Sequence, residues 1–241
     1  MKKFFIEKEK IDNSRILLDG AEFLHASKVL RTEIGENIVC LCGDEFEYHC
    51  TITEITKKFL IAKVNQKVLC LKNPKFNITL FQGAVKGEKL ELITQKCTEL
   101  GISALIPFES QFTIAKKNIT KIERLQKISQ EACKQCGRSK PMEIFEFVKF
   151  KDLENSLKTF DLVLFLYENA PLESTLEKNI TQIQKAKSVA IIVGAEGGFS
   201  DEENLKLLNL NATPICLGQR ILRAETAAIT ICGFISFLKN N

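Results

Sequence analysis

Three short turns in the second half of the chain carry residue types that can hold a small ligand and act on it. Each turn follows a short apolar run: Leu166–Glu168 follows DLVLF, Gly194–Gly198 follows SVAIIV, and Leu217–Arg223 follows TPIC. The glycines let the backbone approach a ligand closely and adopt positive φ, so their exposed N–H and C=O groups can contact an adenine edge or a ribose. The polar residues at these turns and just after them are Glu168, Glu196, Arg220, Arg223, Glu225 and Thr226.

These polar groups are suited to proton transfer and to stabilising charge. A carboxylate can accept a proton, and an arginine can stabilise negative charge that develops on a substrate. Arginine is rare here: of 34 Lys plus Arg only six are Arg, and Arg138, Arg220 and Arg223 fall in or near glycine-containing turns. Because Lys supplies charge alone, the retained arginines indicate a need for a planar, bidentate donor. A compositional accident or a surface ion pair is the alternative for any one of them.

An α/β sheet must position the turns. Short apolar runs alternate with helical patterns, which is typical of parallel strands joined by helices, and ligands of such sheets bind at the carboxyl ends of the strands. The predicted strands are 77–85, 102–108, 161–168, 188–194 and 213–218, and the predicted helices are 87–101, 118–138, one that begins after Ser200, and 225–238. Gly101 is the predicted C-cap of the first helix, and Ser200 with Glu203 forms a capping box. The last helix is apolar nearly all round, which predicts burial in the core or in a subunit interface.

The same elements offer a structural role to several of the polar residues. Glu225 and Thr226 lie in the first turn of the last helix, where an acidic residue suits the helix dipole. For Glu196, the structural alternative to a functional role is that it serves only the helix that begins at Ser200. The expected convergence of these residues with Arg223 at one edge of the sheet favours an active site.

Residues 1–72 predict a small β-rich domain, and residues 73–241 a larger α/β domain. KKFFI and the alternating segment 37–68 predict short strands, with a turn at Gly43 and a short helix over 21–31. Short strands closed by turns suggest a small barrel, and Pro74 marks the linker. Such modules often bind nucleic acid, although the fold alone does not establish this.

The composition is that of an ordinary globular protein, with 45% hydrophobic and 27% charged residues. A formal charge of +4 permits an RNA or phosphate partner without requiring one. No apolar run approaches the length of a membrane span, and MKKFFIEKEK lacks the apolar segment of a signal peptide, so a cytoplasmic protein without a membrane partner is expected. The absence of a G-x-G-x-x-G, a P-loop and a nucleophile elbow, with only His25 and His49 available, argues against a dinucleotide enzyme, a P-loop NTPase and a serine hydrolase.

The nine cysteines are expected to be free thiols, mostly inside apolar runs. Two groups could ligate a metal or carry out redox chemistry: Cys40, Cys42, His49 and Cys50, and the CxxC of Cys133 and Cys136. The first group falls on a predicted β-hairpin, and no second CxxC completes the other. Buried or incidental thiols are therefore favoured over a metal site, because zinc sites carry paired ligand motifs.

Five motifs in order resemble one family. VGAEGGFSDEE and LGQRILRAETAA carry the resemblance in the glycine-rich turns, and KGEKLELITQKCTELG, ERLQKISQEACKQCGRSKP and HASKVLR extend it over essentially the whole chain. The sequence resembles the SPOUT-class methyltransferases, and most closely the bacterial enzymes that methylate N3 of a uridine in 16S ribosomal RNA. One departure is Ala195, where that family usually has Pro; Ala keeps a small side chain but loses the fixed φ.

The resemblance implies a fold beyond the reach of the residue patterns. The larger domain would be a SPOUT trefoil-knot methyltransferase domain with a parallel sheet, an exception to the rule that chains are unknotted, and residues 1–72 would be a PUA-like RNA-binding β-barrel. The knot would form both a homodimer interface and the pocket for S-adenosyl-L-methionine (SAM), with no metal. The implied cofactor-binding residues are Leu166, Tyr167, Glu168, Gly194, Glu196, Gly197, Gly198, Leu217, Gly218, Ile221, Leu222 and Thr226.

The resemblance also implies roles in catalysis and in binding 16S rRNA of the small ribosomal subunit. Arg223 would stabilise the negative charge left on uracil when N3 loses its hydrogen, and Glu225, Glu196 or water would accept the proton. The implied RNA-binding residues are His25, Arg31, Lys86, Lys96 and Arg138. Three alternatives stay open: a SPOUT enzyme for another RNA site or atom such as a ribose 2′-OH, an RNA-binding relative without catalysis, and a nucleotide-using α/β enzyme of another class.

Overall fold

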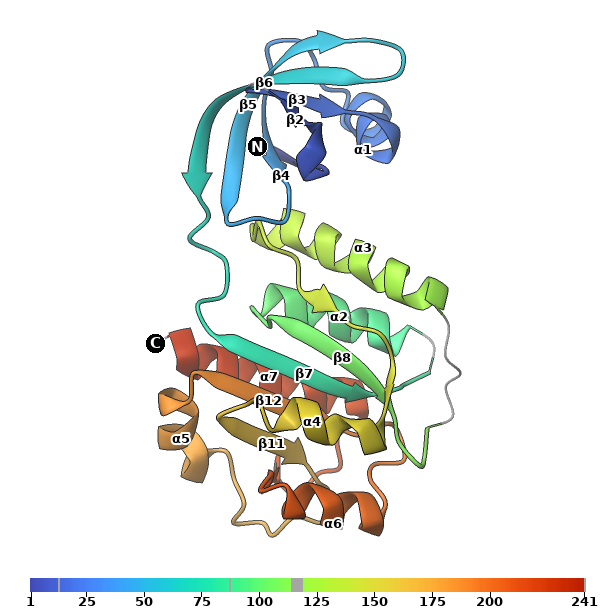
Figure 1. Ribbon diagram of the computed structural model, residues 1–241, viewed down its shortest axis with the longest axis vertical. Coiled ribbons are helices and arrows are strands. Elements are labelled where there is room, and N and C mark those ends of the chain that lie inside the picture. The colour runs from blue at the N-terminus through green and yellow to red at the C-terminus, as the bar shows by residue number, and fades with distance from the viewer. Residues whose placement is uncertain (13, 87, 114–118, 241) are drawn as a thin grey trace. The chain divides into compact units, whose positions relative to one another are not determined.

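The chain divides into two compact units in the computed structural model, which describes residues 1–12, 14–86, 88–113 and 119–240 (Figure 1). Unit 1 comprises Met1–Asn73 and Cys133–Pro141, and unit 2 comprises Pro74–Ala132 and Met142–Asn241. Gly87 and Asn118, which the sequence placed at the starts of helices, lie outside the described residues. The sequence assigned 133–141 to the larger domain. In the structure Cys133 packs against Phe5, Val39 and Leu41 of unit 1, so a distant apolar contact decides where this segment belongs.

Unit 1 is built on a six-stranded sheet with the order β1-β4-β5-β6-β3-β2. The strands are β1 (Lys2–Phe5), β2 (Ile11–Asp12), β3 (Arg15–Leu18), β4 (Asn37–Leu41), β5 (Phe46–Ile55) and β6 (Leu60–Leu69). β1 pairs with β4 in parallel, and every other pair of neighbours is antiparallel. Helix α1 (Gly20–Leu24) continues into a π-helical turn over His25–Val29, where the sequence predicted one short helix. The strands β2 and β3 were not predicted.

The core of unit 1 uses cysteine as a small apolar residue. Cys40 and Cys50 lie fully inside a cluster with Phe4, Ile38 and Ile52. A hydrogen bond with Cys50, together with burial, raises the pKa of the Cys40 thiol, which disfavours the thiolate that a metal requires. Within the described ranges, no group of three or more His, Cys, Asp or Glu side chains is placed to hold a metal ion.

Unit 2 is built on a seven-stranded sheet in which all pairs are parallel. The strand order is β10-β8-β7-β12-β11-β13, and β9 also pairs with β8. The strands are β7 (Asn77–Gly83), β8 (Ala104–Glu109), β9 (Glu143–Ile144), β10 (Val148–Lys149), β11 (Leu162–Leu166), β12 (Ser188–Val193) and β13 (Thr213–Ile215). The helices are α2 (Lys89–Glu99), α3 (Ile119–Cys136), α4 (Leu153–Leu157), α5 (Ile180–Lys185), α6 (Asp201–Asn209) and α7 (Ala224–Asn240). The predicted parallel α/β sheet is confirmed.

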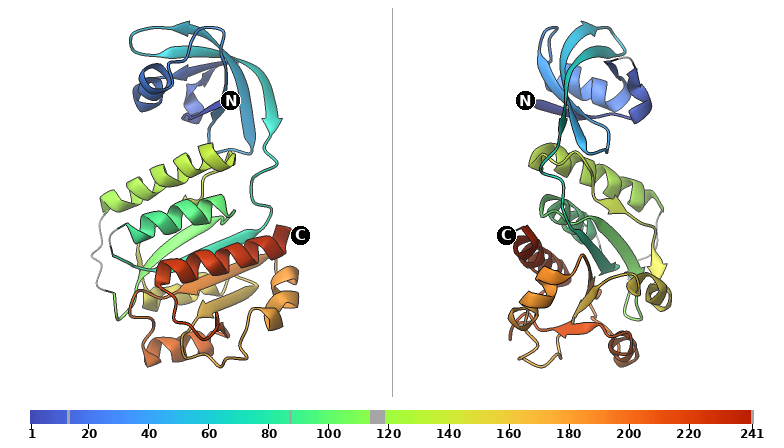
Figure 2. Two further views of the ribbon diagram at one scale, coloured as in Figure 1. Left: turned by 180° about the vertical axis from the view of Figure 1, so that it is seen from behind. Right: turned by 60° about the vertical axis from the view of Figure 1, so that its left-hand side comes forward.

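Both faces of this sheet are covered, which explains why its central strands are mostly apolar. Neighbouring residues of a strand point to opposite faces: Leu80 and Ile191 pack in the cluster that includes α2 and α7, whereas Phe81 and Ile192 pack in the cluster that includes α4 and α6. Figure 2 shows α2 and α7 together on one face of the sheet. In the part of the chain that the structure describes, no helix is long and apolar enough to cross a membrane.

Helix α7 is held at its end by a buried lysine. Lys239 is 7% exposed, and its Nζ donates hydrogen bonds to the carbonyl oxygens of Ile183 at 3.2 Å, Gln184 at 3.0 Å and Ala186. The same ammonium lies 4.4 Å from the centre of the Phe76 ring. Burial lowers the pKa of Lys239, yet the carbonyls at the end of α5 still favour a cation there. Lys239 therefore fastens α7 to α5.

The substitution Lys239→Met is expected to lower the free energy of unfolding by about 2 kcal/mol, because it keeps the apolar stem but leaves buried carbonyls without a donor. Urea unfolding followed by circular dichroism measures this. Lys158→Met, which removes an exposed pair with Glu154, is the matched control and should cost less than about 0.5 kcal/mol. Equal losses for the two variants would contradict the role assigned to Lys239.

Candidate active site

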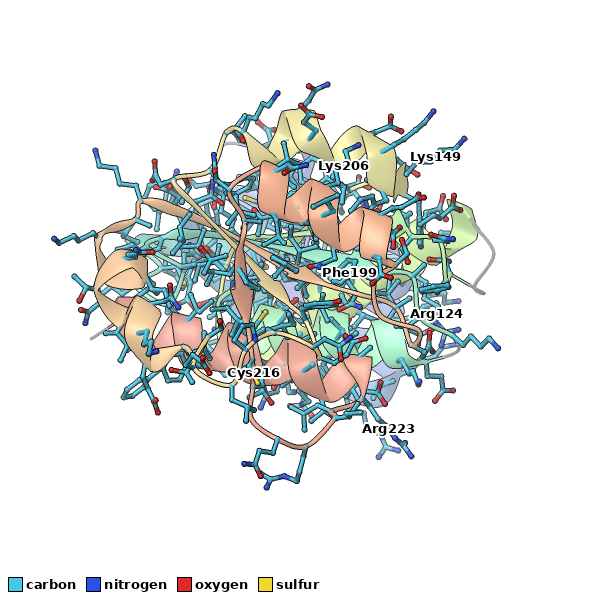
Figure 3. The ribbon with its side chains drawn as sticks, turned by 90° about the horizontal axis from the view of Figure 1, so that it is seen from below. Arg124, Lys149, Phe199, Lys206, Cys216 and Arg223 are labelled. Atoms are coloured by element: carbon cyan, nitrogen blue, oxygen red, sulfur yellow. The ribbon has the colours of Figure 1, made fainter. Side chains whose placement is uncertain are left out.

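The three turns picked out in the sequence surround one cavity of about 480 Å³. They follow β11, β12 and β13, and β11 lies between the other two strands in the sheet. Because all three strands are parallel, their carboxyl ends meet at the same edge. Figure 3, seen from below, labels Cys216 and Arg223, the two ends of the segment that completes the cavity wall. The predicted convergence of the turns is confirmed.

Most of the residues predicted to hold a cofactor lie on the cavity wall. They are Leu166, Tyr167, Glu168, Gly194, Glu196, Gly197, Gly198, Leu217, Gly218, Ile221 and Leu222. Arg220 and Arg223 line the same cavity, and both are exposed. Two predicted residues do not line it: Thr226 is exposed on α7, and Glu225 lines a neighbouring cavity.

The glycine-rich turn is fitted closely to its surroundings. Gly198 has a φ of +67°, and a Cβ atom there would lie 2.6 Å from Oε1 of Glu168. The backbone N–H of Gly198 donates to the carbonyl of Ala195 at 3.0 Å, which closes the turn. Helix α6 then begins at once, through the predicted capping box: the Ser200 hydroxyl accepts from the Glu203 N–H, and the Glu203 carboxylate accepts from the Ser200 N–H. The turn has little freedom to move.

Two residues of β7 that the sequence patterns did not single out support this turn. The buried Gln82 side chain donates through Nε2 to the carbonyls of Gly83 at 3.0 Å and Gly194 at 3.1 Å. At Gly83 a Cβ atom would lie 2.3 Å from the backbone nitrogen of Ala195. A Gln that directly follows the apolar residues Leu80 and Phe81 in the predicted strand is the signal that could have identified Gln82.

The substitution Gln82→Leu is expected to lower the free energy of unfolding by about 1–2 kcal/mol, because it removes the donor from two buried carbonyls. The Oε1 atom of Gln82 has no hydrogen-bond partner among the described residues, so its loss offsets part of the cost. A thermal unfolding midpoint measures the change. An unchanged midpoint would show that the Gly194 turn does not depend on Gln82.

The Glu196 carboxylate accepts hydrogen bonds from two groups of the protein itself. Its Oε1 accepts from the backbone N–H of Lys86 at 3.0 Å and from Nζ of Lys89 at 3.1 Å. Partial burial acts to raise the pKa of Glu196, but these two hydrogen bonds outweigh it and lower the pKa below its ordinary value. Glu196 is thus a fixed anion and a poor proton acceptor.

The Glu225 carboxylate makes a weaker contact with Lys89 than Glu196 does. Its side chain is 13% exposed, and its Oε2 atom lies 3.7 Å from Nζ of Lys89. That atom is buried and has no hydrogen-bond partner among the residues that the structure describes. Glu225 lines a second cavity of about 510 Å³ together with Glu88, Lys89, Glu91, Leu92, Gln95 and Ile128. Lys89 therefore lines both cavities.

The predicted RNA-binding residues fall in both units. In unit 1, Arg31 is exposed and has a φ of +46°, and His25 packs edge-on against the Phe4 ring. In unit 2, Lys86 is exposed and Lys96 forms an ion pair with Glu99. Arg138, in unit 1, is 3% exposed, and burial lowers the pKa of its guanidinium. In this conformation the Arg138 side chain does not face a phosphate from solvent.

Comparison with known proteins identifies the family. Residues 72–236 match the RNA methyltransferase domain, and residues 18–65 match the RNA methyltransferase PUA domain. The chain is 31% identical to the ribosomal RNA small subunit methyltransferase E of Bacillus subtilis, covering 98% of this chain and 96% of that protein, and 32% identical to the protein of the same name from Rickettsia conorii, covering 98% and 95%. A solved Legionella pneumophila methyltransferase, in complex with the bound cofactor SAM, is 29% identical with a TM-score of 0.88, covering 98% and 96%. The chain belongs to this family of RNA methyltransferases with an N-terminal PUA domain.

Proposed function

We propose that the protein transfers a methyl group from SAM to N3 of a uridine in the 16S rRNA of the small ribosomal subunit. The observation that carries the proposal is the single cavity formed by three turns, with Arg223 on its wall. Relatives named ribosomal RNA small subunit methyltransferase E align over almost the whole chain, and the Legionella pneumophila relative binds SAM. The choice of N3 rests on the sequence motifs that resemble the uridine-N3 methyltransferases.

The residues of the cavity fit the cofactor. Its volume of about 480 Å³ lies in the range of about 300–1,000 Å³ that small-molecule sites occupy. The partly buried side chains of Leu166, Leu217 and Leu222 give it apolar walls, and the exposed Glu196 and Gly197 of the glycine-rich turn offer backbone groups for hydrogen bonds. When bound, SAM supplies a methyl group on a positively charged sulfur, which leaves with the electron pair of the broken sulfur–carbon bond.

The protein's own residues have to position uracil and manage its N3 proton. In the proposed reaction the Glu225 carboxylate accepts that proton, because its Oε2 atom has no hydrogen-bond partner in the described ranges, whereas Glu196 is held by Lys86 and Lys89. The electron pair left on N3 then forms the new bond to the methyl carbon. Arg223 stabilises the negative charge that spreads over the uracil ring before this bond is complete. Uracil must be unpaired for N3 to be reached.

Unit 1 would hold the RNA near exposed Arg31 and near His25, with Lys86 and Lys96 of unit 2 as further phosphate contacts. The buried Arg138 is left out of this set.

We also propose that the chain forms a trefoil knot, in which α7, the helix after the Cys216–Arg223 segment, is threaded through a loop. Helix α7 packs against β7, β12 and α2 although it follows the edge strand β13, which supports this threading.

The exposed Phe237 and Thr230 of α7 support a homodimer through this helix. An rRNA substrate supports a cytoplasmic location.

Transfer from labelled SAM tests the proposal. Purified protein should move label into small ribosomal subunits from cells that lack the modification, and calorimetry should detect SAM binding in their absence. Binding without transfer would indicate a non-catalytic relative. The absence of both SAM binding and methyl transfer would overturn the proposal.

A further inference from the structure

Lys89, the first residue of α2, stands where three segments meet. Its Nζ donates to Glu196 of the glycine-rich turn at 3.1 Å and lies 3.7 Å from Glu225 at the start of α7. The neighbouring backbone N–H of Lys86 donates to the same Glu196 oxygen. One ammonium thus contacts two carboxylates that lie on different elements.

The two carboxylates are not equivalent. Glu196 takes two hydrogen bonds on one oxygen, from Lys86 and Lys89. Oε2 of Glu225 has the longer contact with Lys89 and no hydrogen-bond partner among the residues that the structure describes. The Glu225 side chain is 13% exposed, compared with 30% for Glu196. A shared cation of this kind fixes the separation of the two carboxylates, while it leaves Oε2 of Glu225 able to accept a hydrogen bond from a ligand.

We infer that Lys89 is a positioning residue for methyl transfer: it secures Glu196 to the wall of the cofactor cavity and holds Glu225 at the second cavity, where it faces uracil N3. This inference rests on the proposed function. It assigns the second cavity to the target base, since Glu225 lines that cavity and not the first. The apolar side chains of Leu92 and Ile128 and the amide of Gln95 line the same space, which suits a flat ring with polar edges.

Other charged groups near Lys89 do not replace it. Glu88, the N-cap of α2, and Glu91 of α2 line the second cavity, and Glu91 is paired with Arg124 at 2.8 Å. On the segment after β13, Arg220 and Arg223 line the cofactor cavity. Removal of the Lys89 ammonium therefore leaves Glu196 and Glu225 as two neighbouring negative charges without their shared cation.

The substitution Lys89→Met tests the inference through the plateau rate of single-turnover transfer at saturating SAM. The plateau rate should fall about tenfold because the carboxylate is no longer held in place. SAM affinity should change less than about threefold, since Glu196 keeps its hydrogen bond from the Lys86 N–H and the three turns that form most of the cavity wall are unchanged. Lys89→Arg should restore most of the plateau rate.

A second background separates positioning from damage to the fold. In Glu225→Gln, where the proton acceptor is absent, adding Lys89→Met should change the rate by less than about twofold, because the two residues act as a unit. Lys158→Met, with the same loss of charge on α4's exposed pair, should leave the rate unchanged. An undiminished plateau rate in Lys89→Met would overturn the inference. A further loss in the Glu225→Gln background as large as the loss that Lys89→Met causes alone would also overturn it. Absence of transfer by the unmodified protein would instead overturn the proposed function.

Discussion

Replacing Arg223 by Ala is expected to lower the rate of methyl transfer by about 10²–10³-fold, the usual cost of removing one donor that stabilises developing charge. Arg223 immediately precedes α7 (Ala224–Asn240), lines the cofactor cavity and is exposed. When uracil loses its N3 proton, the charge spreads to oxygens that a planar guanidinium can contact in pairs. Single-turnover transfer to unmodified small subunits, with SAM in excess, measures the rate.

Arg223→Lys is the matched comparison for this effect. Lysine keeps the charge but lacks the planar pair of donors, so it should recover only part of the lost rate. SAM binding measured by calorimetry should survive in both variants, which shows that the cavity has kept its shape. Full activity of Arg223→Ala would remove Arg223 from the reaction.

The substitution Gly83→Ala should abolish SAM binding and lower the free energy of unfolding by about 3 kcal/mol or more. The new Cβ atom would lie 2.3 Å from the Ala195 nitrogen and 2.6 Å from the Gly194 carbonyl carbon, and both are backbone atoms that cannot move aside as a flexible side chain does. Forced displacement of this kind is costly in a packed interior. It would shift the glycine-rich turn away from the cavity that it lines.

Gly233→Ala is the control for that prediction. The same methyl group at Gly233 on α7 would meet only the Leu100 side chain, at 3.7 Å, which is ordinary contact. Alanine in a helix interior is also favoured over glycine by up to about 1 kcal/mol. The control should therefore unfold at the same temperature as the unmodified protein or slightly higher. Equal behaviour of the two variants would contradict the close approach of β7 to the turn.

The sequence could predict the local part of the site. Each of its three turns follows a buried strand, and the parallel arrangement alone brings Leu166–Glu168, Gly194–Gly198 and Leu217–Arg223 to one edge. The capping box of Ser200 and Glu203 was also readable, because its members are three residues apart. These features depend on neighbours in the chain, which is why pattern and propensity suffice for them.

The supporting residues depend on contacts between distant segments. Gln82 reaches Gly194 only because β7 pairs with β12 in a register that sets Gln82 opposite Val193. Lys89 meets Glu196 and Glu225 across similar separations. The assignment of Cys133–Pro141 to unit 1 has the same origin. Very short elements such as α4 and β9 were not predicted because few residues carry their pattern.

The chemical identity of the methylated nucleoside tests the proposed reaction most directly. Small ribosomal subunits that lack the modification are incubated with the protein and SAM, and their 16S rRNA is then digested to nucleosides and analysed by mass spectrometry against synthetic standards. We expect one new product, N3-methyluridine, which is absent when the Arg223→Ala variant replaces the unmodified protein. A 2′-O-methylated nucleoside, or a methyl group on any other base, would contradict the assignment of uridine N3 as the methyl acceptor.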